Sequence, residues 1–187
     1  MDLHPSTATL KPNAYYELVI NGEPVTALRA RAAKDGHHYT PVQYREYKLK
    51  VANAIKGKFA REIMANKDDP KQAKQKRYAL LLLIRLHRDH GDWDNYAKAI
   101  QDALQDAGLV HDDRQVTVGF CAKCIQDGPL QAEFCLFEIP ESGPQIVIAA
   151  FRVMKYLFAA YKPGSHLGAL AAGYGLWEGR EYGINQN

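Results

Sequence analysis

Residues 78–108 read YALLLLIRLHRDHGDWDNYAKAIQDALQDAG, and this stretch decides the fold of the 187-residue chain. Its first nine residues, Tyr78–Leu86, are almost continuously apolar, which indicates a strand buried on both faces at the centre of a sheet. Residues 95–107 have helical periodicity, with Asp94 at the N-cap position and Gly108 where a helix commonly ends. A strand–helix–strand unit of this length can return the start of the next strand to the end of the first.

The rest of the chain predicts an α/β (α+β) fold, in which helices pack on a mixed β-sheet. Further strands are expected at 15–20, 116–125 and 130–139, and a helix at 44–65. The Asp127-Gly128 dipeptide favours a hairpin between the last two strands, although Pro129 argues against a simple two-residue turn. Residues 66–76 are polar and contain Pro70, so we expect an exposed linker there.

Two parts are expected along the chain: a domain over residues 13–140, and a C-terminal helix with a flexible Gly-rich tail over 141–187. Residues 146–161 are mostly apolar but carry Arg152 and Lys155 on one side, which is typical of an amphipathic helix rather than a membrane span. The segment is expected to pack on the domain, on a second subunit or on a partner protein.

The composition favours a cytoplasmic protein. Three Cys in 187 residues do not suit a disulfide-stapled secreted domain. Neither a signal peptide nor an apolar run of about 18 residues is recognisable.

The charge is divided unevenly. Residues 1–91 contain 17 Lys or Arg and 9 Asp or Glu, whereas residues 92–187 contain 7 and 12. This asymmetry indicates a polyanionic partner beside an acidic site for a cation, or, with similar weight, a solvated surface on which charges have segregated.

Several carboxylates are expected to gather where the strand and helix of residues 78–108 meet. Asp92 and Asp94 are two residues apart, so an extended backbone would point both to one face. Asp112 and Asp113 open the next strand and can return to the same end. Carboxylate oxygens are the ligands that Mg²⁺ prefers, and Lys98, four residues after Asp94, could offset their charge or hold a phosphate.

Caps and turns also explain such aspartates. Asp92 and Asp94 could cap the helix while Asp112 and Asp113 lie in a solvated turn. A D-x-D pair alone favours this structural interpretation, and only the addition of Asn95, Lys98 and the distal pair strengthens the functional one.

The combined pattern resembles the RusA family of Holliday junction resolvases. The resemblance rests on DWDNYAK at 92–98, Asp102-Ala103-Leu104, Ala107-Gly108 and DDRQV at 112–116, and extends more loosely over residues 15–139. It implies a RusA-like fold and a homodimeric endodeoxyribonuclease that cuts four-way DNA junctions in recombination and repair. The implied cofactor is Mg²⁺, with Mn²⁺ as a substitute.

Carried over to this sequence, the resemblance implies that Asp92, Asp94 and Asp113 are catalytic metal ligands and that Lys98 is a catalytic lysine, with Asp112 as a neighbour. The residues expected to contact DNA are basic or polar and lie in the 24–39 loop or beside the aspartates. They are Arg29, Arg31, Lys34, Arg85, Arg88, Asn95 and Lys98.

Other functional interpretations remain at this level. One is a catalytically silent module that binds branched DNA, and another is a metal-dependent nuclease acting on flaps or other branched DNA. Cys121 and Cys124 form a CxxC motif on a predicted strand, where side chains three apart face opposite ways, so we expect inert thiols rather than a metal site. Tyr44 and Tyr47 are expected to pack in the core or on a helix surface rather than to stack on bases.

Overall fold

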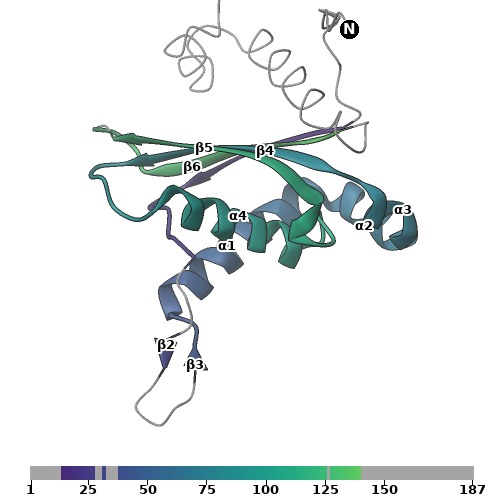
Figure 1. Ribbon diagram of the computed structural model, residues 1–187, viewed down its shortest axis with the longest axis horizontal. Helices are drawn as coiled ribbons and strands as arrows, with labels where there is room; N and C mark the ends of the chain where they lie inside the picture. Colours follow the sequence, from purple (N-terminus) through teal and green to yellow (C-terminus); the bar gives the residue numbers. More distant parts are fainter. Residues whose placement is uncertain (1–13, 28–30, 33–37, 126, 140–187) are drawn as a thin grey trace, which may run out of the picture. The chain divides into compact units, whose positions relative to one another are not determined.

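The computed structural model describes residues 14–27, 31–32, 38–125 and 127–139 (Figure 1). The elements of these residues are β1 Tyr15–Asn21, β2 Arg31–Ala32, β3 His38–Tyr39, α1 Val42–Lys58, α2 Ala60–Asp68, α3 Pro70–Gln75, β4 Tyr78–Leu86, α4 Trp93–Ala107, the 3-10 turn η1 Asp113–Gln115, β5 Val116–Ile125 and β6 Gln131–Glu138. Residues 14–138 form one compact unit. The predicted C-terminal helix and tail lie outside the described residues.

The main sheet has four strands in the order β1-β6-β4-β5. β4 pairs with β5 in parallel and with β6 in antiparallel fashion, and β6 also pairs with β1 in antiparallel fashion. All nine residues of β4 are buried, which confirms the predicted central strand. The sheet is therefore mixed, as expected.

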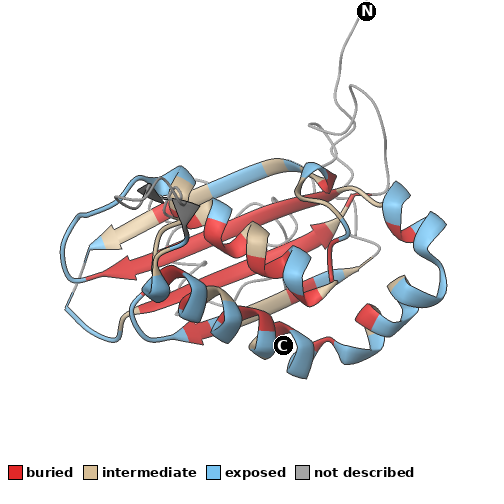
Figure 2. Cartoon of the chain, turned by 90° about the horizontal axis from the view of Figure 1, so that it is seen from below, coloured by how far each residue is buried: buried red, intermediate tan, exposed pale blue. Residues whose placement is uncertain are grey.

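Helices α1 and α4 cover one face of this sheet (Figures 1 and 2). The core between these layers contains alternate residues of β4, such as Leu80 and Leu82, with Val51 and Ile55 from α1 and Leu104 from α4. Burying one such aliphatic side chain stabilises the fold by about 1.5–3 kcal/mol. In the described part of the chain, no helix is both long and apolar enough to cross a membrane.

The prediction of a hairpin around Asp127-Gly128 is wrong. β5 and β6 are not neighbours, because β4 lies between them. The dipeptide belongs to a connection that passes from one side of β4 to the other, and Gly128 does adopt a positive φ of 139°. Glycine at a turn reports local backbone geometry and does not identify the strand that pairs next.

The helix expected over residues 44–65 is two helices. Phe59 leaves the helical region with φ −119° and ψ 34°, which separates α1 from α2. Its ring packs edge-on against Tyr16, with the ring centroids 5.4 Å apart. Tyr44 and Tyr47 are buried, as predicted.

The exposed linker expected over residues 66–76 is largely helical. α2 continues to Asp68, and α3 begins immediately after Asp69. The Asp69 carboxylate accepts a hydrogen bond from the Gln72 backbone N–H at 3.0 Å, and Pro70 occupies the first turn. An aspartate N-cap followed by proline is a helix-start signal, so the proline marks a beginning here rather than a linker.

Candidate active site

The N-terminus of α4 carries Asp92 and Asp94 at the exposed surface. Asp92 is the N-cap residue with extended φ and ψ, while Asp94 already lies in the first turn. The backbone from Asp92 to Asp94 is therefore not extended as expected, and the assignment of Asp94 as the N-cap is wrong. Gly108 ends the helix in the left-handed conformation with φ 82°, as predicted.

The loop between β4 and α4 is fixed by contacts on several sides. Tyr96 donates its hydroxyl hydrogen bond to the His90 carbonyl oxygen at 3.1 Å. Lys123 of β5 donates to the Gly91 carbonyl oxygen at 2.9 Å and forms an ion pair with Asp89. These contacts hold the backbone that leads directly into Asp92.

Gly91 has a structural reason to be glycine. Its φ is +66°, and a Cβ there would lie 2.6 Å from Thr26 Cγ2. The same neighbouring segment is tied to α4, because the Ala27 N–H donates to the Asn95 carbonyl oxygen at 2.8 Å. The close approach of residues 26–27 therefore excludes a side chain immediately before Asp92.

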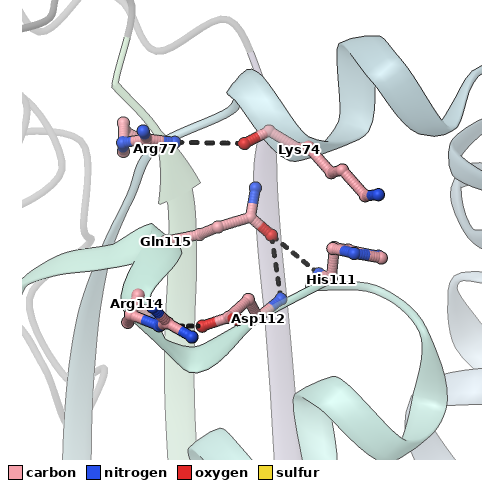
Figure 3. A pocket seen from close by; sticks show the side chains of 6 residues that line it. All are labelled: Lys74, Arg77, His111, Asp112, Arg114 and Gln115. Atoms are coloured by element: carbon pink, nitrogen blue, oxygen red, sulfur yellow. Dashed lines mark hydrogen bonds and ion pairs between the residues drawn. The ribbon is translucent and has the colours of Figure 1, made fainter.

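The second aspartate pair lies at η1, where its two members have different roles. Asp112 caps the turn: its carboxylate accepts from the Arg114 N–H at 2.9 Å, and this bond holds the pKa of Asp112 below its usual range. The Gln115 side chain accepts from the Asp112 N–H at 3.1 Å, which completes a capping box (Figure 3). Asp112 is thus explained by local structure, which leaves Asp113 as the candidate site residue.

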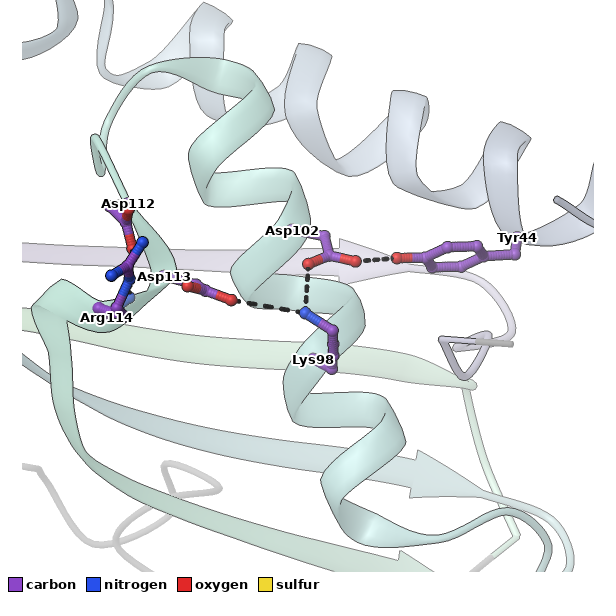
Figure 4. Close-up of polar contacts among 6 residues, drawn as sticks. All are labelled: Tyr44, Lys98, Asp102, Asp112, Asp113 and Arg114. Carbon is purple, nitrogen blue, oxygen red and sulfur yellow. Dashed lines mark hydrogen bonds and ion pairs between the residues drawn. The ribbon is translucent and has the colours of Figure 1, made fainter. Parts of the chain in front are cut away.

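Lys98 connects Asp113 to α4 (Figure 4). Its Nζ lies 3.0 Å from Asp102 Oδ1 and 3.5 Å from Asp113 Oδ2. The hydrogen bond from Lys98 to Asp102 is the largest of the effects that raise the pKa of Lys98 above its ordinary value of 10.5. The Tyr44 hydroxyl donates to the other oxygen of Asp102. Lys98 is therefore held cationic by Asp102 and Asp113.

Asp92 and Asp94 offer a hard cation suitable oxygen ligands. Neither has an ion pair within the described ranges, and the Asn95 amide reaches Asp92 only at 3.5 Å. Asp113, by contrast, faces Lys98. Because β5 runs parallel to β4 and Val116 pairs with Tyr78, Asp113 lies beside the start of β4, so the expected return to the end that carries Asp92 is wrong. Across the described residues no three His, Cys, Asp or Glu side chains lie close enough to share a metal ion. The donor chemistry fits a divalent metal, but the three carboxylates do not form an assembled metal centre.

The basic residues predicted to contact DNA differ in how accessible the structure leaves them. Arg88 is exposed in the loop after β4, whereas Arg85 lies within β4 with only 4% of its surface exposed. A guanidinium buried in this way cannot reach a DNA phosphate. Arg29 and Lys34 lie outside the described residues. Arg31 begins β2, and its side chain also lies outside what the structure describes.

Arg85 instead faces an acidic neighbour inside the sheet. Glu133 of β6 is also buried, and burial raises its pKa while the charge of Arg85 lowers it. The alternation along β4 places Arg85 on the opposite side from Leu82 and Ile84, which face α1 and α4. The position of Arg85 is therefore better explained by its burial on the sheet near Glu133 than by contact with DNA.

The CxxC motif lies on β5 and forms no disulfide. Burial raises the pKa of the Cys121 thiol to about 11. A thiol with this pKa stays protonated at neutral pH, which makes it a poor nucleophile and metal ligand.

Sequence reasoning missed the contacts that hold Lys98 and the loop before Asp92. Asp102 follows Lys98 by four residues, so the i,i+4 spacing was a usable signal. Tyr44 was assigned to packing, in the core or on a helix surface, although a buried tyrosine usually finds a hydrogen-bond partner for its hydroxyl. Lys123 gave no local signal, because its partners are more than 30 residues away.

A comparison with family models relates the sequence to known proteins. The model described as Endodeoxyribonuclease RusA matches residues 21–131, which is more than half of the 187 residues. The match runs from the last residue of β1 to the first residue of β6 and contains all of α4 and η1. A search of curated proteins gave no match.

Proposed function

Because the chain belongs to the RusA family of endodeoxyribonucleases, we propose that it hydrolyses phosphodiester bonds at four-way DNA junctions with the help of a divalent metal ion. The bridge from Lys98 to Asp113 supports this proposal most directly. It joins a helix residue to a carboxylate 15 positions later at one exposed site, within the part of the chain that the family model matches.

Asp92 and Asp94 would hold the metal ion, with Asp113 as the proposed third ligand. A bound Mg²⁺, or Mn²⁺ in its place, would supply an activated water and stabilise charge on the phosphate that is cut. Lys98 would donate hydrogen bonds to an oxygen of the same phosphate. Its contacts with Asp102 and Asp113 keep it protonated and oriented for that role.

DNA would be held next to the carboxylates by residues that remain accessible. Among the described residues these are Arg88, Asn95 and Lys98, and we extend the proposal to Arg29, Arg31 and Lys34 of the basic loop. The Ala27–Asn95 hydrogen bond anchors the start of that loop beside α4. Each cationic contact with a phosphate would add affinity that is independent of DNA sequence and weakened by salt.

The proposal includes a homodimer in the cytoplasm. A four-way junction is resolved by two cuts, so a symmetric pair of subunits would supply one catalytic site for each cut. The absence of disulfides among the three cysteines suits a reducing compartment.

Incubating the full-length protein with labelled four-way junction, linear duplex and flap, each with and without Mg²⁺, tests the proposal. We expect paired cuts in the junction that require metal, and slower or no cutting of linear duplex. Junction binding without cleavage would support a silent branch-binding module instead. Preferential cutting of the flap would identify a branched-DNA nuclease of different specificity.

Replacing Asp102 with Asn should slow junction cleavage about tenfold, because Lys98 loses the carboxylate that orients it. The pKa of Lys98 should fall toward 10.5, so the lysine stays protonated near neutral pH and junction affinity should hardly change. Single-turnover cleavage rates and separate binding measurements check this.

Two further variants distinguish positioning from general damage to α4. Asp102→Glu keeps a carboxylate and should recover part of the rate. Asp106 also lies on α4, and its carboxylate pairs with Lys48 of α1 at 2.9 Å. Asp106→Asn removes that carboxylate and should leave the cleavage rate unchanged. Equal losses in Asp102→Asn and Asp106→Asn would contradict a specific role for Asp102.

A further inference from the structure

A basic pocket lies between the end of α3 and the turn η1. It has a volume of about 330 Å³ and is lined by Lys74, Arg77, His111, Asp112, Arg114 and Gln115 (Figure 3). Three of these side chains are cationic and one is a carboxylate, so positive charge is in excess. The residues come from two segments far apart in the sequence, and the fold brings them together.

Gln115 fixes the shape of this pocket. Its amide nitrogen donates to the carbonyl oxygens of Ala73 at 2.7 Å and Lys76 at 2.9 Å. Its amide oxygen accepts from the N–H groups of His111 at 2.7 Å and Asp112 at 3.1 Å. These four bonds use the donors and acceptors of the side chain, so the two walls are joined before any ligand arrives.

The cations of the pocket retain unused hydrogen-bond donors. The Lys74 ammonium has no hydrogen bond or ion pair with any described residue. Arg114 donates from its Nε to Asp112 at 3.1 Å, and its side chain is 88% exposed. Arg77 donates from Nη1 to three carbonyl oxygens, those of Lys74, Gln75 and Lys76, at the end of α3. An anion with several acceptor oxygens would satisfy the remaining donors.

The pocket adjoins the candidate active site through η1. Asp112 and Arg114 line the pocket, whereas Asp113, which lies between them in the chain, directs its carboxylate to Lys98 (Figure 4). Neighbouring Cα atoms are about 3.8 Å apart, and a DNA strand advances about 3.4 Å per nucleotide along the helix axis. A strand whose phosphate lies at Asp113 therefore has its next phosphates within reach of Arg114.

We propose that this pocket binds a backbone phosphate of the DNA strand that is cut, within a few nucleotides of the cleaved bond. The inference rests on the proposed function and extends it. The pocket would fix the direction in which the strand leaves the catalytic carboxylates, through the cations of Lys74 and Arg114. Free inorganic phosphate has the same chemistry, and the experiment distinguishes the two sources.

The test uses the double variant Lys74→Gln/Arg114→Gln in the full chain, without metal so that DNA stays intact. Junction affinity should fall about tenfold, since charge-assisted hydrogen bonds are lost. The slope of log affinity against log salt should flatten by about 0.9 for one lost phosphate contact. The matched control Lys71→Gln/Arg45→Gln removes the same charges from exposed positions outside the pocket, and should change the slope less.

Ethylation of single DNA phosphates locates the contact. Wild-type protein should be hindered by ethylation at a phosphate close to the cleaved bond, and the double variant should have lost that sensitivity. Equal affinity, slope and ethylation pattern in the pocket variant and its control would overturn the proposal. Circular dichroism melts establish that both variants are folded.

Two further outcomes separate this inference from the proposed function. If wild-type protein cleaves junctions but the pocket variant binds like its control, the pocket proposal alone fails. If wild-type protein cleaves no DNA, but the pocket variant binds the junction more weakly and with a flatter dependence of log affinity on log salt, the phosphate contact stands and the hydrolytic function fails. Inorganic phosphate that binds wild-type protein but not the variant, and leaves the junction affinity of wild-type protein unchanged at constant ionic strength, would overturn the assignment to a DNA phosphate.

Discussion

Replacing Asp92 or Asp94 with Asn should lower the rate of junction cleavage by about 100-fold or more. Asn keeps the size of the side chain but removes the negative charge that would hold a divalent ion. Both side chains are exposed and neither has an ion pair within the described part of the chain, so the substitutions should leave the fold intact. Cleavage rates at saturating Mg²⁺ measure the effect.

Junction affinity should remain within about threefold of wild type in the same variants, because cationic side chains rather than carboxylates bind the phosphates. Asp106→Asn is the matched control, since it removes an exposed carboxylate from the same helix. Wild-type cleavage by either Asp92→Asn or Asp94→Asn would show that the metal site has been assigned to the wrong residues.

Replacing Gln115 with Ala should lower the free energy of unfolding by about 3 kcal/mol, because four backbone groups lose their partner. Gln115 is 4% exposed and joins the residues before η1 to the end of α3. The melting temperature should fall by roughly 6–12 °C for a domain of this size. Thermal and denaturant unfolding measure both quantities.

The control is Gln105→Ala, an exposed glutamine on α4, which should change stability by less than about 0.5 kcal/mol. Gln115→Glu adds a sharper comparison. Its carboxylate would face the Ala73 and Lys76 carbonyl oxygens, which raises its pKa above that of the unfolded chain. This variant should therefore be most stable at low pH and lose stability as the pH rises through the folded-state pKa. A Gln115→Ala variant as stable as the control would contradict the role of the side chain.

Strands and the core helix of this protein could be predicted because their signals are local. The apolar run of β4 indicates burial on both faces, and Gly108 ends α4 in a conformation that glycine adopts readily. Strand pairing is a different matter. Nothing near Asp127-Gly128 indicates that β6 crosses to the far side of β4, since that choice depends on which sheet edge is left open by the β4–α4–β5 unit.

The candidate site was predicted by composition and spacing better than by geometry. Asp92 and Asp94 were expected to lie on one extended segment of backbone. The strand instead ends at Leu86, a loop follows, and Asp94 is already helical. Lys98 was expected to offset the charge of the aspartates or to hold a phosphate, and it does pair with Asp113, but its shorter contact is with Asp102. A lysine side chain is long enough to reach carboxylates at several positions on its own helix. Which of them it pairs with also depends on tertiary contacts, such as that with Asp113, which the spacing in the sequence does not show.

The position of β6 has a consequence for how the protein is made. β6 is the last strand of the described sheet to be synthesised, yet it lies between β1 and β4 and pairs with both. β4, α4 and β5 are consecutive, so on the ribosome they can associate before β6 has been made. β1 must wait for residues 131–138, and until then one long apolar edge of β4 has no partner. That edge is where a nascent chain would be most exposed to aggregation and where a chaperone would act.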